Sequence, residues 1–394
     1  MKNRTLFFYI LVLVLLSVCI GYLTQFTGLN HDFSDVITYM RLAYLGIEIL
    51  IILKILQLIV KTEVKELIKK IAISFVALLS LIIILEGVFM FVPRSHGGGG
   101  QESLAARLWF SKYWEVNALG YRDAEVKPEK DKSKFNIVVI GDSFVAGHGI
   151  KEPSKRFSNL LQNKLSASYK VHNLGLNGAD TQAEYSKLVQ FPIKPSLIIL
   201  VHHPNDIERV PRSQTGIRST GGNIKRLKAS LLPPSIHESL VKNSYLINYF
   251  YWKFYPVTSL DSEVDIAGKE YFASKSGQSS HLSAYLNEDV FKQHLQNLHQ
   301  FVLLSREESI PLIVMLLPET WDETIEFSKT YTNQPIAAFF TRQNVSVLDL
   351  YETLKQLPVR DRIVSNNDAH PSELTHQKVA ELLYNHLKTG KFIN

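Results

Sequence analysis

The stretch FNIVVIGDSFVAGHG, residues 135–149, decides how the rest of the chain is interpreted. Its run of β-branched apolar residues from Ile137 to Ile140 predicts a strand that is buried on both faces and lies inside a parallel sheet. Gly141, Asp142 and Ser143 then follow at the carboxyl end of this strand, which is the edge of an open α/β sheet where ligands bind. Ser143 is therefore a candidate nucleophile. For a Gly-Asp-Ser sequence alone, the alternative is an ordinary turn between a strand and a helix.

Strand and helix patterns alternate after this stretch, which predicts a parallel sheet with helices on both faces. Further strands are expected at 170–174, 196–201, 311–317 and 345–350, and helices at 157–165, 181–190, 290–304 and 372–387. A polar and aromatic insertion at about residues 207–285 interrupts this alternation. Its residues either contact a substrate or form a helix packed on the core, followed by a solvated loop.

The first 93 residues have the composition of a membrane anchor. Residues 5–23 carry no charge, and residues 71–92 are interrupted only by Glu86, so both are long enough to cross a bilayer. Residues 42–60 form a third, weaker candidate because they include two charged side chains. We therefore predict about three transmembrane helices in 1–93, a connector at 94–134, and a catalytic domain at 135–394.

The positions of the basic residues set the expected orientation, because cytoplasmic flanks of membrane spans are enriched in Lys and Arg. Lys2 and Arg4 precede the first span, and four lysines lie between residues 61 and 70. The catalytic domain is accordingly expected outside the cytoplasm, on a multi-pass protein of the cell membrane. A cleaved signal peptide is the alternative for the first span, but no small-x-small cleavage site follows it.

Charge and cysteine content argue against a nucleic-acid partner and against a disulfide within the chain. The net charge of +6 over 394 residues is too mild to indicate a nucleic-acid partner. The only cysteine, Cys19, lies in the first predicted span, so no disulfide can form within the chain.

Polar blocks also follow the other predicted strands. Asn173 to Gly178 reads NLGLNG, His202 to Asp206 reads HHPND, and Asn367 to Pro371 reads NDAHP. Because the carboxyl ends of parallel strands meet at one edge of a sheet, we expect these blocks to converge with residues 141–143.

These four blocks, in this order, resemble the SGNH or GDSL hydrolase superfamily. The resemblance covers about residues 135–390 apart from the insertion, and residues 117–123 are similar to the lead-in of membrane-tethered members. It implies an α/β fold: an SGNH-type, flavodoxin-like three-layer sandwich with a parallel sheet, here preceded by transmembrane helices. It also implies a serine hydrolase that needs no cofactor and no metal.

The resemblance assigns the catalytic roles residue by residue. Ser143 corresponds to the nucleophile and His370 to the general base that removes its proton, with Asp368 orienting the imidazole. The oxyanion hole corresponds to the backbone N–H groups of Ser143 and Gly178 and to the side-chain amide of Asn205. A glycine at position 178 would let the backbone approach the oxyanion closely.

Three neighbouring residues, Asp142, His203 and Asp206, are expected to support the site. His203 stands where the family has glycine, which would narrow the site, and Asp368 is one residue closer to His370 than in the commoner D-x-x-H motif. His148, His202 and His203 are possible metal ligands. Since no acidic or cysteine cluster accompanies them, we favour histidines on the surface or in support of the site.

The predicted function is a membrane-anchored, extracytoplasmic serine esterase that removes acyl groups, acetyl first of all, from a cell-envelope carbohydrate or lipid. One alternative is an O-acetyltransferase that modifies a polysaccharide together with a membrane acyltransferase or another polysaccharide-synthesis partner. The other is a glycan-binding scaffold without activity, against which the intact Ser143, Asn205 and His370 argue.

Overall fold

The computed structural model describes residues 47, 49–52, 54–55, 62–92, 95, 103–207, 234–254, 284–320, 322–365 and 368–394. The described residues belong to two compact units. One unit draws on Met1–Pro93, Glu102–Arg107 and Arg226–Tyr251, and the other on Arg94–Gln101, Leu108–Lys225 and Trp252–Asn394. The domain boundaries expected from the sequence stay predictions.

The first unit contains one long apolar helix, α3 (Thr62–Met90). Its stretch Glu66–Met90 is long and apolar enough to cross a membrane, by length and composition. The side chains of this stretch are largely exposed in the structure, as expected for a surface that lipid would cover. The predicted span at 5–23 and most of the one at 42–60 lie outside the described residues.

The insertion contains the helices α10 (Pro234–Asn243) and α11 (Tyr245–Phe254). All of α10, and α11 as far as Tyr251, belong to the same unit as α3. The Glu86 carboxylate of α3 accepts hydrogen bonds from the Ser244 hydroxyl, from the Tyr245 N–H at 2.8 Å and from the Leu246 N–H at 3.4 Å. A carboxylate is favoured there because the first N–H groups of a helix lack partners within the helix. The ring of Phe89 also packs against those of Tyr249 and Phe250 in α11, with ring centroids 4.6 and 5.2 Å apart. This part of the insertion therefore packs on α3.

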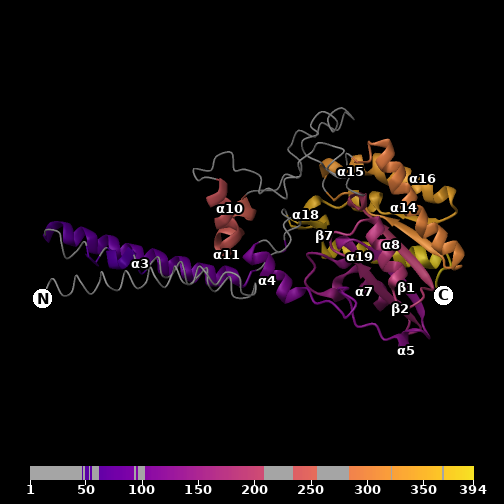
Figure 1. The fold of residues 1–394 in the computed structure, drawn as a ribbon, viewed down its shortest axis with the longest axis horizontal. Helices are drawn as coiled ribbons and strands as arrows, with labels where there is room; N and C mark the ends of the chain where they lie inside the picture. Colours follow the sequence, from indigo (N-terminus) through magenta and orange to yellow (C-terminus); the bar gives the residue numbers. More distant parts are fainter. Residues whose placement is uncertain are drawn as a thin grey trace. The chain divides into compact units, whose positions relative to one another are not determined.

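The second unit is built on a five-stranded parallel sheet, which confirms the predicted fold class (Figure 1). Its strands are β1 (Phe135–Gly141), β2 (Tyr169–Gly175), β3 (Leu197–His202), β4 (Leu312–Leu316) and β5 (Ser346–Asp349). The strand order is β2-β1-β3-β4-β5, so β1 pairs with a strand on each side. This central position agrees with the uninterrupted apolar run from Ile137 to Ile140. The order reverses between β1 and β3, where an open α/β sheet forms its ligand-binding crevice.

Helices cover both faces of the sheet, which completes three layers. Alternate residues of β1 point to opposite faces, as the two-residue period of a strand requires. Ile137 and Val139 pack with α7 (Phe157–Lys164) and α19 (Glu373–Thr389). Val138 and Ile140 pack with α8 (Thr181–Gln190), α14 (Glu288–Glu307) and α16 (Gln334–Arg342).

Some elements were not expected from the sequence. A second, antiparallel sheet pairs β6 (Ile363–Ser365) with β7 (Asp368–Pro371), and a π-helical turn (Lys329–Asn333) joins α15 (Asp322–Ser328) to α16. Strands of three or four residues are too short to produce a recognisable period in the sequence. The short helices are α4 (Leu104–Tyr113), α5 (Pro128–Asp131), α6 (Ser143–Ala146), η1 (Pro153–Lys155), η2 (Pro204–Asp206), α17 (Tyr351–Lys355) and α18 (Val359–Arg362).

Candidate active site

Ser143 lies at the first position of α6, directly after the end of β1. The preceding Asp142 caps this short helix, because its Oδ1 accepts the Phe144 N–H at 2.8 Å. The turn that follows needs two glycines in the left-handed region, Gly147 at φ 72° and Gly149 at φ 83°. The local sequence therefore bends the chain sharply and presents the serine hydroxyl at the edge of the sheet.

His370 and Asp368 reach this hydroxyl from β7. His370 Nε2 lies 2.8 Å from Ser143 Oγ, and His370 Nδ1 lies 2.6 Å from Asp368 Oδ1. In a strand, residues two apart point to the same side, so a D-x-H spacing brings both side chains together. The short spacing that distinguishes this chain is thus compatible with the extended conformation of β7. We assign the proton to Nδ1, because Asp368 can only accept.

The Asp368 carboxyl is fully buried. Burial by itself would raise its pKa, but the charge and hydrogen bond of His370, with smaller contributions from His148 and Ser95, hold the pKa well below its usual range. Asp368 is therefore an anion at neutral pH, and it favours a proton on His370 when the imidazole accepts one.

Asn205 is held with its amide nitrogen at the Asp142 carboxylate, whose Oδ2 also lies 3.4 Å from Ser143 Oγ. Its Nδ2 donates to Asp142 Oδ2 at 2.9 Å, and its Oδ1 lies 2.7 Å from His203 Nδ1. His203 itself stacks on Phe144, with ring centroids 3.8 Å apart. An amide nitrogen carries two hydrogens, so the bond to Asp142 still leaves one N–H for an oxyanion. The histidine that replaces the family glycine thus orients Asn205.

Gly178, the third expected oxyanion donor, follows β2 and has a φ of 70°. A Cβ added at this position would meet no atom within 4 Å. The glycine is therefore required by the backbone conformation and not by a lack of space for a side chain.

Asp206 supports the site through His203, because its Oδ2 accepts the His203 N–H at 2.7 Å. It is fully buried near Glu184 of α8, a residue that the sequence gave no reason to select. Burial, and then repulsion from Asp142 and Asp180, raises the pKa of Glu184 well above its usual value. Burial, and then repulsion from Glu184 and Asp142, raises the pKa of Asp206 in the same way. Both groups therefore bind protons more readily than an exposed carboxyl.

The three histidines considered as metal ligands are all buried, so the surface alternative is wrong for each of them. His202 points away from the nucleophile, with its Nε2 3.0 Å from His294 Nε2 and 3.3 Å from the Tyr285 hydroxyl. His148 lies beside the catalytic pair, where its ring stacks on His370 with centroids 4.3 Å apart.

Donor atoms of His148, Asp368 and His370 lie within 4.8 Å of one another, close enough to hold a metal ion. Two of these residues are already bonded to each other, and His370 is also bonded to Ser143. We interpret this cluster as the hydrogen-bonded relay of a serine nucleophile.

Buried arginines fix the turn that follows Ser143. Arg122 donates to the carbonyls of Gly147 and Ile150, both at 2.6 Å, and Arg156 donates to the carbonyl of Ala146 at 3.3 Å. Burial and the nearby Arg156 lower the pKa of Arg122 to about 9, so it remains charged at neutral pH. The similarity of residues 117–123 to the lead-in of membrane-tethered hydrolases was the only sequence signal for this role.

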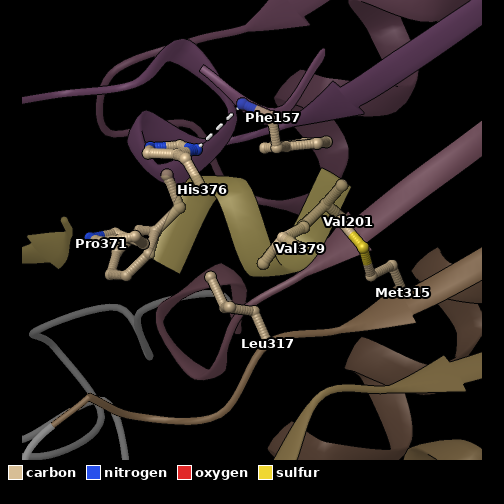
Figure 2. A pocket seen from close by; sticks show the side chains of 8 residues that line it. Phe157, Val201, Met315, Leu317, Pro371, His376 and Val379 are labelled. Carbon is tan, nitrogen blue, oxygen red and sulfur yellow. Dashed lines mark hydrogen bonds between the residues drawn. The ribbon is translucent and has the colours of Figure 1, made fainter. Parts of the chain in front are cut away.

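Figure 2 shows an apolar hollow, whose lining includes Phe144 and Pro371, the residues that follow Ser143 and His370 in the sequence. It is lined by Phe144, Phe157, Val201, Met315, Leu317, Pro371, His376 and Val379. His376 accepts the Phe157 N–H at 3.2 Å, and burial lowers its pKa to about 3, which keeps it neutral. Because the side chains of Ser143, Asn205 and His370 do not line this hollow, we regard it as a packing gap.

Comparison with known proteins gives one family. The sequence model of the GDSL-like lipase/acylhydrolase family matches residues 137–383. No curated protein sequence matches the chain.

Several solved structures are similar to this chain at low sequence identity. A lipase/acylhydrolase from Enterococcus faecalis is 14% identical, with 65% of this chain and 96% of that chain covered and a TM-score of 0.37. The esterase EstA from Pseudoalteromonas sp. is 13% identical, with 66% of this chain and 100% of that chain covered and a TM-score of 0.37. A carbohydrate acetylesterase family member from Sinorhizobium meliloti is 12% identical, with 66% and 99% covered and a TM-score of 0.33.

Proposed function

Since the chain belongs to the GDSL-like lipase/acylhydrolase family, a family of serine ester hydrolases, we propose that it is a membrane-anchored, extracytoplasmic esterase. Its proposed substrate is an acylated, above all acetylated, carbohydrate or lipid of the cell envelope. The observation that carries the catalytic part is the unbroken hydrogen-bonded sequence from Ser143 Oγ through His370 to Asp368, with distances of 2.8 and 2.6 Å.

In the first half of the proposed reaction, Ser143 Oγ attacks the ester carbonyl carbon while His370 Nε2 takes the hydroxyl proton. The negative charge of Asp368 stabilises the imidazolium that forms. Asn205 Nδ2 and the N–H groups of Ser143 and Gly178 donate to the developing oxyanion. When the tetrahedral intermediate collapses, the proton on His370 passes to the leaving sugar or lipid oxygen, and the acyl group stays on Ser143.

In the second half, His370 removes a proton from water, and the resulting nucleophile attacks the acyl-enzyme. A second tetrahedral intermediate forms at the same carbon and uses the same oxyanion donors. Its collapse releases the carboxylic acid and returns the proton to Ser143. The two half-reactions need the same groups, so the same residues support transfer to a sugar hydroxyl if one occupies the position of the water.

The membrane part of the proposal is supported by α3, whose stretch Glu66–Met90 can cross a bilayer. Four lysines lie between residues 61 and 70, at the amino end of this helix, which favours a cytoplasmic location for that end. A reporter that works only outside the cytoplasm should therefore be active when fused after Asn394 and silent when fused near Glu66. The reverse pattern would place the catalytic residues in the cytoplasm and remove a cell-envelope substrate.

The experiment on catalysis uses the full-length protein in detergent, incubated with acetylated oligosaccharides in the presence or absence of a non-acetylated acceptor. We expect free acetate as the principal product and no turnover in Ser143→Ala. Ser111→Ala is a matched control, since that exposed hydroxyl donates to the Leu108 carbonyl, away from the candidate site residues, and it should keep full activity. Acetylated acceptor as the principal product would replace hydrolysis by transfer and call for an acyl-delivering partner. Full activity in Ser143→Ala would refute both.

A further inference from the structure

We propose that His148 and Ser95 are positioning residues of this site: together they fix the Asp368 carboxylate and one face of the His370 imidazole. The inference rests on the proposed function, because the reaction supplies the reason to fix these groups. Neither residue belongs to the four blocks at the ends of the strands that suggested the site. Both act through Asp368 and His370, and neither touches the reacting atoms.

The two oxygens of Asp368 have different partners. Oδ1 bonds to His370, with its Nδ1 at 2.6 Å and its backbone N at 3.2 Å. Oδ2 accepts the hydroxyl hydrogen of Ser95, and His148 Nε2 lies 3.8 Å from it. A carboxylate held through one oxygen alone can rotate about its last side-chain bond and lose its alignment with the imidazole. Partners on the second oxygen prevent this rotation.

The orientation of the His148 ring follows from its other contacts. Its Nδ1 lies 3.5 Å from the amide nitrogen of Asn177, which can only donate, so we assign the ring hydrogen to Nε2. Nε2 lies 3.8 Å from Asp368 Oδ2, which is too far for a direct hydrogen bond, so the N–H acts on the carboxylate through its dipole. The backbone N–H of His148 donates to the Ser143 carbonyl at 3.0 Å, which ties the ring to the same turn as the nucleophile.

Stacking adds a second constraint. The rings of His148 and His370 are nearly parallel, at 24°, with centroids 4.3 Å apart. On its other sides His148 contacts Trp109, Phe110 and Trp114, with centroids 5.7, 5.4 and 5.9 Å away. This wall keeps the ring in place and excludes water from it.

The departure of this chain from the commoner D-x-x-H motif makes such support understandable. With one residue between them on β7, Asp368 and His370 approach along the same face of a short strand. Gly149, which follows His148, leaves no room for a side chain, since a Cβ would lie 2.5 Å from Val364 Cγ2 and in tight contact, at 3.1 Å, with Asp368 Oδ2. The turn after Ser143 therefore supplies both the space and the partner for the second carboxylate oxygen.

The test compares variants of the full-length protein in detergent with an acetyl ester substrate over a range of pH. His148→Phe keeps a ring for stacking and removes the Nε2 hydrogen. We expect kcat to fall about 10- to 100-fold with KM changed much less, as for a small misplacement of catalytic groups. The acid limb of the kcat/KM profile should move to higher pH by about half a unit or more, because a carboxylate that loses the nearby N–H dipole stabilises the imidazolium more strongly. Ser95→Ala should act in the same direction, and Ser95→Thr should restore most of the activity.

His386→Phe is the matched control, since that ring also bonds through Nε2, to Ser346, and lies parallel to an aromatic ring outside the site. It should leave kcat and the pH profile unchanged. Wild-type kcat and an unmoved acid limb in both His148→Phe and Ser95→Ala would overturn the inference. A fall in kcat with an unmoved acid limb and a lowered unfolding temperature would also overturn it, because the residues would then only support the fold. Wild-type activity that chelators abolish and Zn²⁺ restores would make the cluster a metal site instead.

A second readout separates this inference from the proposed function. The rate at which a fluorophosphonate labels Ser143 depends on His370 as base and needs no ester substrate. Slower labelling in His148→Phe, with normal labelling in His386→Phe, supports the inference even if the natural reaction is transfer. Equal labelling rates in wild type and in both positioning variants would contradict it even if ester hydrolysis is confirmed.

Discussion

Replacing Gly149 by alanine tests how closely the turn after Ser143 is fitted to Asp368. Gly149 has a φ of 83°, in the left-handed region. An added Cβ would lie 2.5 Å from Val364 Cγ2 and 3.1 Å from Asp368 Oδ2. Gly120 provides a matched control, because its φ is 84° but its Cβ would meet nothing within 4 Å. The two alanine variants therefore share the conformational cost and differ in the steric one.

The expected magnitudes follow from these two contributions. The left-handed conformation costs a residue with a Cβ about 1–2 kcal/mol, which is the whole effect expected for Gly120→Ala. Overpacking of a tightly fitted position adds about 1–3 kcal/mol, so Gly149→Ala should lose about 2–5 kcal/mol of stability. Val364 is β-branched and stiff, and Asp368 is bonded on both oxygens. The displacement should therefore reach His370 and lower kcat about 10- to 100-fold.

Denaturant unfolding and ester hydrolysis of the two full-length variants measure these effects. Gly120→Ala should keep wild-type kcat, and Gly149→Ala should lose both stability and kcat. If Gly149→Ala is no less stable than Gly120→Ala and retains wild-type kcat, the close fit between the turn and Asp368 is wrong.

Three further predictions concern other contacts. The pKa of Glu184 is raised in the folded state, so between pH 4.5 and this raised pKa the native protein holds a proton that the unfolded chain loses. Over that range the free energy of unfolding should fall by about 1.4 kcal/mol per pH unit. Glu184→Gln should remove this contribution, so the stability of the variant relative to wild type should increase as the pH rises. Unfolding temperatures of both proteins from pH 5 to 8 measure this, and a parallel pH dependence in the two would contradict it. Glu86→Gln weakens charge-assisted hydrogen bonds to the start of α11 and should lower the stability by about 1.5–3 kcal/mol in thermal unfolding. Glu66 is exposed, so Glu66→Gln should not lower it, and equal melting of the two variants would refute the contact between Glu86 and α11. Asn205→Ala should lower kcat about 100- to 1000-fold in the ester assay with little change in KM, and a kcat within a few-fold of wild type would exclude it from the oxyanion hole.

The sheet could be predicted from the sequence because its signals are local. The β-branched run at 137–140 corresponds to β1, and the expected helix at 181–190 is α8 with the same bounds. Ser372 accepts the Thr375 N–H as the N-cap of α19, as a serine before an apolar helical pattern predicts. Periodicity and capping depend on neighbours within a few residues, so one chain segment contains the information.

The supporting residues could not be predicted in the same way. Ser95 and Asp368 are 273 positions apart, and no spacing rule connects them. His148 was considered as a surface or supporting residue, but its ring is buried against His370 because α4 contributes an aromatic wall. The strand β7 has four residues, too few for a period, so the geometry of the D-x-H motif followed only from the structure.

The central claim is that His370 activates Ser143 as a nucleophile, and labelling with a fluorophosphonate tests it most directly. Full-length protein in detergent is treated with the reagent, digested and examined by peptide mass spectrometry. We predict one adduct, on the peptide that contains Ser143, with labelling absent in Ser143→Ala and strongly slowed in His370→Ala. An adduct on a different serine, or undiminished labelling of Ser143 in His370→Ala, would contradict the account.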